Sequence, residues 1–295
     1  MGLGTSVGVS SSLFHLSSLA LDRLKFSHMY TTMGIVGIFI AARGIGLHIS
    51  HIMPVLTITI TTTGLYILND VFDLEIDRVS HPERALPRGL ISTRQATAAS
   101  VLLMALGSAA AFWVNVTSGI FVGVIAIFGI LYSAPPVRLR RFPVIPNAII
   151  GLFVFLSFMA GATFWGSQVT GKLVLGGLLL WATFLCASNA KDLSDLEGDE
   201  GQGVKTLPLI FGEDQGFIIT SMIVYSAFLF PIVFIILFDL NLLFIAPIIA
   251  FMLLEVYCLR RFWRIRETDE GMKWFGMGFA QFVAVQITLM VAALV

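Results

Sequence analysis

Two acidic motifs with the same spacing are the residues of this chain best suited to chemistry. The first runs from Asn69 to Asp77 with the sequence NDVFDLEID, and the second runs from Lys191 to Asp199 with the sequence KDLSDLEGD. Both contain D-x2-D-L-E-x-D. A helix turns about 100° per residue, so the three Asp residues of each motif would share an arc of roughly 60° on one face. Each motif therefore predicts a stripe of carboxylates.

The setting of the two stripes points to a bound metal and a polyanionic ligand. Each stripe closes an apolar run long enough to cross a bilayer, where carboxylates are costly unless a cation compensates them. One stripe alone would fit a solvated helix end, but two copies with identical spacing favour Mg²⁺ bound by carboxylates and bridged to phosphate. The predicted Mg²⁺ and catalytic residues are Asp70, Asp73, Asp77, Asp192, Asp195 and Asp199.

Basic residues in the same loops fit a diphosphate. Arg84 and Arg88 follow the first motif, and Lys191 directly precedes Asp192 in the second. A third loop has the sequence YSAPPVRLRR, which starts at Tyr132 and ends at Arg141. Its Pro-Pro pair must end a helix, which places Tyr132 at the membrane boundary with three Arg beyond it. The alternatives are a topology signal for the arginines and an interfacial aromatic role for Tyr132.

Composition places these motifs in a polytopic membrane protein. Hydrophobic residues make up 57% of the chain and charged residues 12%, whereas a soluble domain is about a quarter charged. The net charge of zero argues against a nucleic-acid partner. Cys186 and Cys258 lie in apolar segments without CxxC spacing, so we expect packing roles and no disulfide. Closely spaced apolar segments without a long polar insert predict a single domain over residues 1–295.

The apolar segments predict an all-α architecture with an odd number of spans. Nine segments are expected, at 27–47, 52–72, 95–114, 117–134, 144–165, 172–190, 216–238, 241–259 and 273–295. With the N-terminus in the cytoplasm, most Lys and Arg residues fall on the cytoplasmic side, including Arg23 and Lys25, while the outer side keeps Arg43 and Lys172. We therefore expect both motif loops in the cytoplasm and the C-terminus outside.

The recurrence of the motif also predicts an internal repeat. The two copies close the second and the sixth expected segments, so four segments separate equivalent points. This favours duplication of a four-helix unit, about 27–134 and 144–259, with a ninth helix added.

These motifs together resemble the UbiA superfamily of intramembrane prenyltransferases. The resemblance rests on N-D-x2-D-x3-D from Asn69, Y-S-A-P-P-x-R-L-R from Tyr132 and K-D-x2-D-x2-G-D from Lys191, and it extends from about Arg23 to at least Gly212. Within the superfamily, the chain looks most like digeranylgeranylglyceryl phosphate synthases and chlorophyll synthases. The resemblance implies nine transmembrane helices around a central cavity, with a cytoplasmic cap formed by the motif loops.

The resemblance also implies a reaction. An isoprenyl diphosphate, such as geranylgeranyl diphosphate, would ionise with the help of Mg²⁺ and pass its isoprenyl group to a lipophilic acceptor. The acceptor would be geranylgeranylglyceryl phosphate or an aromatic quinone precursor. Six residues are expected to bind the diphosphate: Asn69, Arg84, Tyr132, Arg138, Arg140 and Lys191.

A membrane transporter is the alternative function. Intramembrane carboxylates can line the path of a coupled cation or proton. Alternating access usually places such sites near the midplane of the bilayer, whereas both acidic stripes are expected on one side. The sequence therefore favours the enzyme.

Overall fold

A computed structural model of the protein describes residues 4–43, 52–142, 145–194, 196 and 206–295. The described part is helical, with turns and no strand. Its elements are α1 (Gly4–Ala42), α2 (Ile52–Phe72), α3 (Leu74–Ser80), α4 (Thr93–Val114), α5 (Val116–Ser133), η2 (Leu139–Arg141), α6 (Ile145–Thr163), α7 (Gly171–Ala187), α8 (Ala190–Ser194), α10 (Leu207–Phe211), α11 (Glu213–Ser226), α12 (Leu229–Leu237), η3 (Leu242–Phe244), α13 (Ile245–Arg264) and α14 (Asp269–Leu294).

Helices long and apolar enough to cross a bilayer confirm the predicted all-α membrane architecture. The described part has 8 such helical segments, and they match eight of the nine predicted segments. Three of them join neighbouring elements: α7 with α8, α11 with α12, and η3 with α13. The remaining prediction, 27–47, begins inside α1 and continues into residues outside the described ranges. The protein is an integral membrane protein.

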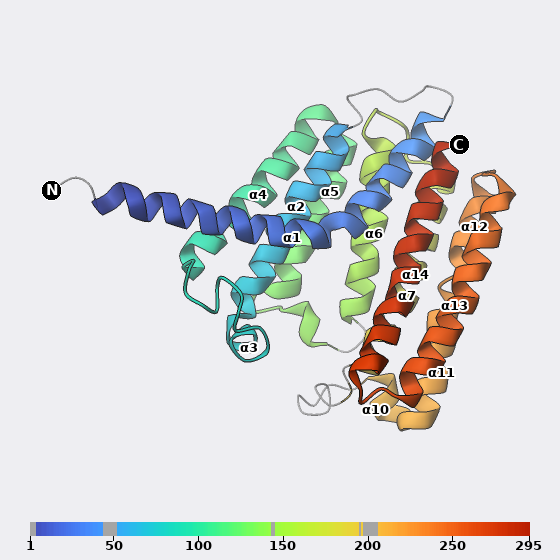
Figure 1. The fold of residues 1–295 in the computed structure, drawn as a ribbon. Helices are drawn as coiled ribbons and strands as arrows, with labels where there is room; N and C mark the ends of the chain where they lie inside the picture. Colours follow the sequence, from blue (N-terminus) through green and yellow to red (C-terminus); the bar gives the residue numbers. More distant parts are fainter. Residues whose placement is uncertain (1–3, 44–51, 143–144, 195, 197–205) are drawn as a thin grey trace.

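The bundle has two distinct ends (Figure 1). The short helices α3 and α10 lie at one end, and the C-terminus of α14 lies at the other. Helix α1 packs on α2, α6 and α14, while its N-terminal end projects sideways beyond the bundle. At 39 residues, α1 is about 58 Å long, which is well beyond the roughly 30 Å of a bilayer core.

Polar residues fix where several of these helices begin. Ser92 caps α4, because its Oγ accepts a hydrogen bond from the Gln95 N–H while the Gln95 side chain returns to the Ser92 backbone. Asn115 separates α4 from α5 and accepts from the Ser118 N–H at 3.1 Å. Such caps satisfy N–H groups that have no partner within the helix. The caps therefore place the turns where the sequence changes from apolar to polar.

Close backbone contact joins α1 to α6. A Cβ atom added at Gly161 of α6 would lie 2.0 Å from the Gly34 carbonyl oxygen of α1, and one added at Gly37 would lie 2.2 Å from the Phe158 carbonyl oxygen. Small residues at membrane helix interfaces permit this approach, and van der Waals packing then holds the helices together. The pairing fixes α1 against the centre of the bundle.

Buried hydroxyl groups add hydrogen bonds between helices. Ser100 of α4 donates to the Gly64 carbonyl of α2 at 2.8 Å, and Ser118 of α5 donates to the Ala160 carbonyl of α6 at 2.9 Å. All four residues lie within helices, so these bonds supplement complete backbone ladders. They tie α2, α4, α5 and α6 into one half of the bundle.

The contact between α1 and α6 makes a testable prediction about stability. Gly161→Ala should lower the melting temperature in detergent, because its Cβ meets backbone that cannot move alone, and overpacking of this kind costs about 1–3 kcal/mol. Gly276→Ala on α14 is the matched control, since nothing lies within 4 Å of the added Cβ. The control should keep or raise the melting temperature, because Ala is the better helix former. Equal losses in both variants would contradict the proposed packing.

Candidate active site

The first acidic motif forms a nearly continuous helical segment at the end of α2. The Asp73 N–H donates to the Asn69 carbonyl at 2.9 Å, and the Asp77 N–H donates to the Asp73 carbonyl at 2.8 Å. These helical hydrogen bonds carry the chain from α2 into α3. The carboxylates therefore follow one another along a helix, as the sequence spacing predicts.

Asp70 is held by an arginine from α1. The Arg23 Nε donates to Asp70 Oδ2 at 2.5 Å, and both side chains are less than 10% exposed. The same guanidinium lies 5.5 Å from the centre of the Phe26 ring. From the sequence, Arg23 was predicted only to set topology, and its pairing with Asp70 was not predicted. The pairing joins residues 47 positions apart, which no local pattern reveals.

Asp73 lies at the centre of a larger polar cluster. The Arg140 guanidinium contacts both carboxylate oxygens of Asp73, and Arg138 Nη2 lies 3.7 Å from Oδ1. Asn69 Nδ2 donates to Asp73 Oδ2 at 2.8 Å, while Ser133 Oγ donates to Asn69 Oδ1 at 3.2 Å. The structure therefore brings together four predicted residues: Asn69, Asp73, Arg138 and Arg140.

The loop after α5 is shaped to deliver these arginines. Arg138 has a left-handed backbone with φ 43°, directly before the single turn of η2 that carries Arg140. Left-handed conformations are uncommon outside glycine, so the surrounding contacts must hold this one. Burial lowers the pKa of the Arg140 guanidinium below its ordinary value, because desolvation disfavours the charged form. The carboxylate of Asp73 opposes this effect by stabilising the charge.

Asp77 is paired with Arg84 from the loop between α3 and α4. A single nitrogen, Nη1, lies 2.8 Å from each carboxylate oxygen of Asp77. The Asp77 side chain is 8% exposed and the Arg84 side chain 29% exposed. Each of the three aspartates of the first motif therefore has an arginine from a different segment of the chain.

The second motif is described only in part. Helix α8 carries Lys191, which is exposed, and Asp192, which is half-buried. Asp195 and Asp199 lie outside the described residues. Helix α10, which follows the motif, lies at the same end of the bundle as α3 (Figure 1). The predicted convergence of the two motifs on one site therefore stays a prediction.

The donor atoms of the first motif suit a hard cation. Carboxylate and amide oxygens are the ligands that Mg²⁺ prefers, together with water and phosphate oxygens. Asp70, Asp73 and Asp77 supply such oxygens along one helical segment, with the Asn69 amide beside them. Within the described ranges, however, no three His, Cys, Asp or Glu side chains already converge as metal ligands. The arginines occupy the carboxylates instead.

Aromatic side chains lie on the membrane side of this cluster. The Tyr66 ring on α2 stacks on Tyr30 of α1 at 6.4 Å and lies 5.7 Å from Phe26. Tyr30 then meets Phe153 of α6 edge to face at 5.8 Å. Tyr132, the predicted diphosphate residue, is partly buried against the same core. Tyr30 and Tyr66 were not predicted, although Tyr66 precedes Asp70 by one helical turn.

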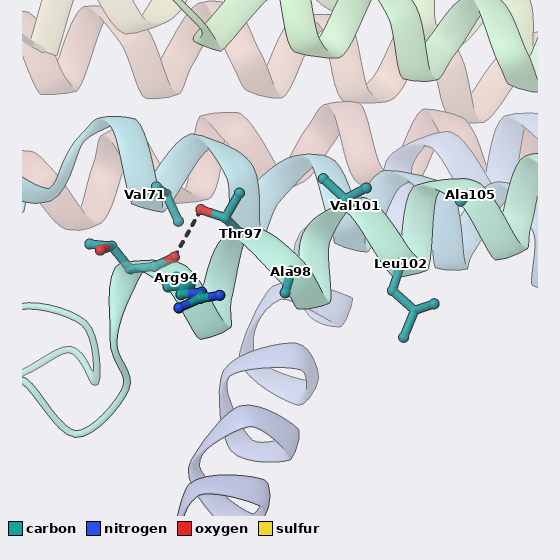
Figure 2. Close-up of a pocket in the computed structure, with 8 residues that line it drawn as sticks. Val71, Arg94, Thr97, Ala98, Val101, Leu102 and Ala105 are labelled. Carbon is teal, nitrogen blue, oxygen red and sulfur yellow. Dashed lines mark hydrogen bonds between the residues drawn. The ribbon is translucent and has the colours of Figure 1, made fainter.

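A groove on the outer face of α4 is separate from these carboxylates (Figure 2). Val101, Leu102 and Ala105 follow one side of the helix, and Arg94 lies near its start. Thr97 Oγ1 donates to the Thr93 carbonyl at 2.8 Å beside Arg94. Val101 and Leu102 are more than half exposed, which suits a surface that faces lipid. Among the predicted site residues that the structure describes, none lines this groove.

Comparison with known proteins places this arrangement in a family. The sequence model of the UbiA prenyltransferase family matches residues 30–284. That range includes both acidic motifs and the loop after Tyr132, and it leaves Arg23 outside.

Curated relatives share about a third of the aligned residues. The digeranylgeranylglyceryl phosphate synthase of Thermococcus kodakarensis is 32% identical over 187 residues, which cover 62% of this chain and 64% of that protein. The synthase of Methanocaldococcus jannaschii is 31% identical over 57% of this chain and 58% of that protein. The match thus spans somewhat less than two thirds of the length of these relatives.

Solved structures share the fold over almost the whole chain. A structure described as giving insights into the biosynthesis of digeranylgeranylglyceryl phosphate synthase in membranes has a TM-score of 0.72 at 23% identity, and the match covers 96% of this chain and 99% of that one. A UbiA homolog from Archaeoglobus fulgidus bound to GPP and Mg²⁺ has a TM-score of 0.64 at 20% identity, over 92% and 99%. Because the family model also spans most of the sequence, the chain belongs to the UbiA prenyltransferase family.

Proposed function

We propose that the protein is a Mg²⁺-dependent prenyltransferase that moves an isoprenyl group from an isoprenyl diphosphate to a lipophilic acceptor. The observation that carries the proposal is the cluster in which each carboxylate of the first motif meets an arginine. Carboxylates suit a divalent cation, and guanidinium groups suit a diphosphate. Membership of the UbiA prenyltransferase family supports the same reaction class.

The metal would be held by the aspartates of both motifs. Asp70, Asp73 and Asp77 would contribute from the first motif, and Asp192, Asp195 and Asp199 from the second, directly or through water. Bound Mg²⁺ would stabilise the negative charge that develops on the leaving diphosphate. The related A. fulgidus structure bound to GPP and Mg²⁺ supports this pairing of ligands.

The arginines on loops would bind the diphosphate itself. Arg84 and Arg140 lie on connections between long helices, and guanidinium groups bind phosphate as well as carboxylate. Arg138 lies beside Arg140, and Asn69 orients the Asp73 carboxylate between them. Lys191 and Tyr132 border the same end of the bundle and would complete the anion site.

The reaction would break one bond and form one. The bond between C1 of the isoprenyl chain and the bridging diphosphate oxygen breaks, and the diphosphate leaves with the electron pair. A nucleophilic atom of the acceptor then bonds to C1 and loses a proton. Apolar surroundings exclude water that would otherwise capture the cation. Tyr66, Tyr30 and Phe153 form a run of aromatic contacts beside the polar cluster, and aromatic faces can stabilise a developing cation.

Geranylgeranylglyceryl phosphate is the acceptor that the relatives favour. The curated proteins of T. kodakarensis and M. jannaschii are both named digeranylgeranylglyceryl phosphate synthase. An aromatic quinone precursor is the other acceptor class. Incubation with labelled geranylgeranyl diphosphate and each acceptor, followed by product extraction, separates the two. Transfer to neither acceptor would contradict the proposal.

We propose further that the end of the bundle with α3 and α10 faces the cytoplasm. Arg84 and Arg140 lie in the motif loops, whereas Lys172 begins α7 on the other side of the membrane. Basic residues are enriched in cytoplasmic loops, which supports this orientation.

Impermeant thiol labelling tests that orientation. Single cysteines at Arg84 and Arg140 should be labelled only from the cytoplasmic side, and one at Lys172 only from the outer side. The background must lack Cys186 and Cys258, which are both free thiols. Labelling of positions 84 and 140 from opposite sides would refute a shared site.

Removal of a carboxylate should abolish transfer. Asp73→Asn keeps the shape of the side chain but removes the charge that a metal ligand needs, so we expect turnover to fall by at least about 100-fold. Glu75→Gln is the matched control, because Glu75 lies two residues away and its side chain is 81% exposed. The control should keep its activity. Chelation of Mg²⁺ should stop transfer by the wild type and by the Glu75→Gln control. Wild-type turnover by Asp73→Asn at saturating Mg²⁺ would refute the role of this residue.

Loss of a loop arginine should weaken binding of the diphosphate selectively. Arg84→Gln should reduce the affinity for geranylgeranyl diphosphate by roughly tenfold to a hundredfold, because a charge-assisted contact contributes about 1.5–3 kcal/mol. Geranylgeraniol lacks phosphate, so its affinity should change little. Arg78→Gln is the control, since Arg78 is exposed and pairs with Glu75. An equal loss for both ligands would assign Arg84 to folding or topology instead.

A further inference from the structure

Arg23 differs from the other arginines of the cluster in how it is held. Arg84 and Arg140 belong to connections between helices, but Arg23 lies within α1, a helix of 39 residues. Its side chain is 8% exposed, its Nε lies 2.5 Å from Asp70 Oδ2, and its guanidinium lies near the Phe26 ring. A side chain packed in this way cannot follow a ligand as a loop residue can. Its effect on the site must pass through Asp70.

The charges around the first motif disfavour a metal ion on its own. Four arginines contact the three aspartates: Arg23 with Asp70, Arg138 and Arg140 with Asp73, and Arg84 with Asp77. A divalent cation entering alone would meet a guanidinium already paired with each of these carboxylates. A diphosphate brings enough negative charge to occupy the loop arginines and leave the carboxylates to the metal. Arg23, which cannot turn to the phosphate, would be the last arginine to release its carboxylate.

We propose that Arg23 is a positioning residue that holds Asp70 in place of the metal and makes metal binding depend on the diphosphate. This inference rests on the proposed function. Without diphosphate, the pair fixes the buried Asp70 carboxylate and neutralises it, which a charge near the bilayer requires. With diphosphate bound, Arg23 would release Asp70 to the metal. Arg23 thus prevents the aspartates from binding a divalent cation before the isoprenyl diphosphate is bound.

Mn²⁺ binding tests this role without turnover. Mn²⁺ prefers the same oxygen ligands as Mg²⁺, and the amount of free Mn²⁺ can be measured by electron paramagnetic resonance on the full-length protein in nanodiscs. Wild type should bind Mn²⁺ weakly alone and at least about tenfold more tightly with geranylgeranyl diphosphate. Arg23→Gln should tighten Mn²⁺ binding without diphosphate by about tenfold or more, because a competing charge is removed from Asp70. The ratio of the Mn²⁺ affinities with and without geranylgeranyl diphosphate should therefore be smaller in this variant than in the wild type.

Three further variants show whether the effect passes through Asp70. Arg23→Gln combined with Asp70→Asn should lose the gain in affinity. Arg78→Gln removes an exposed arginine from the same region and should leave Mn²⁺ affinity within about twofold of wild type. If Arg23→Gln is not recovered folded, Arg23→Lys replaces it, since a single ammonium holds the carboxylate less firmly than a guanidinium. It should shift the affinity in the same direction by a smaller factor.

The outcomes separate this inference from the proposed function. If wild type binds Mn²⁺ with geranylgeranyl diphosphate but the Arg23 variants leave binding without diphosphate unchanged or weaker, Arg23 has only a structural role and the inference is wrong. If wild type binds no Mn²⁺ with or without diphosphate, the proposed metal site itself is wrong, and the inference is overturned with it. A gain that persists in the double variant would also overturn it.

Discussion

Neutralisation of buried carboxylates at the end of a membrane helix is the constraint on which this structure depends. Asp70, Asp73 and Asp77 follow one another along α2 and α3, where each uncompensated charge would be costly. Each is met by an arginine from a separate segment, namely α1, the loop after α5 and the loop after α3. The three ion pairs therefore do more than balance charge. They gather α1 and two loops around one helical segment.

The apolar interior and the polar cluster are positioned by the same helix contacts. Close approach of Gly34 and Gly161 fixes α1 against α6, and Arg23 lies on that same α1 at the level of Asp70. Tyr30, between these two points on α1, continues the aromatic contacts from Tyr66 to Phe153. One helix thus supplies a wall of the core, an aromatic face and a counter-ion for the site.

Local patterns predicted much of the fold and part of the site. The period of the first motif predicted its shared helical face, and the Pro-Pro pair predicted the helix end that brings Arg138 and Arg140 to Asp73. Those features depend on residues close in sequence. The role of Arg23 depends instead on how α1 crosses α2, and no spacing encodes that crossing. The length of α1 was likewise not predicted, because its N-terminal half lacks the hydropathy of a membrane span.

Helix α1 connects the surroundings of the bundle with the site. Its N-terminal end projects beyond the bundle (Figure 1), and Phe14 presents about two thirds of its surface to the surroundings. Leu16, Leu19 and Ala20 then pack against the bundle, and Arg23 follows on the same helix. Because Arg23 and the projecting end belong to one continuous helix, the projecting end and the counter-ion of Asp70 share one backbone. The counter-ion of a buried carboxylate thus belongs to a helix whose far end reaches outside the bundle.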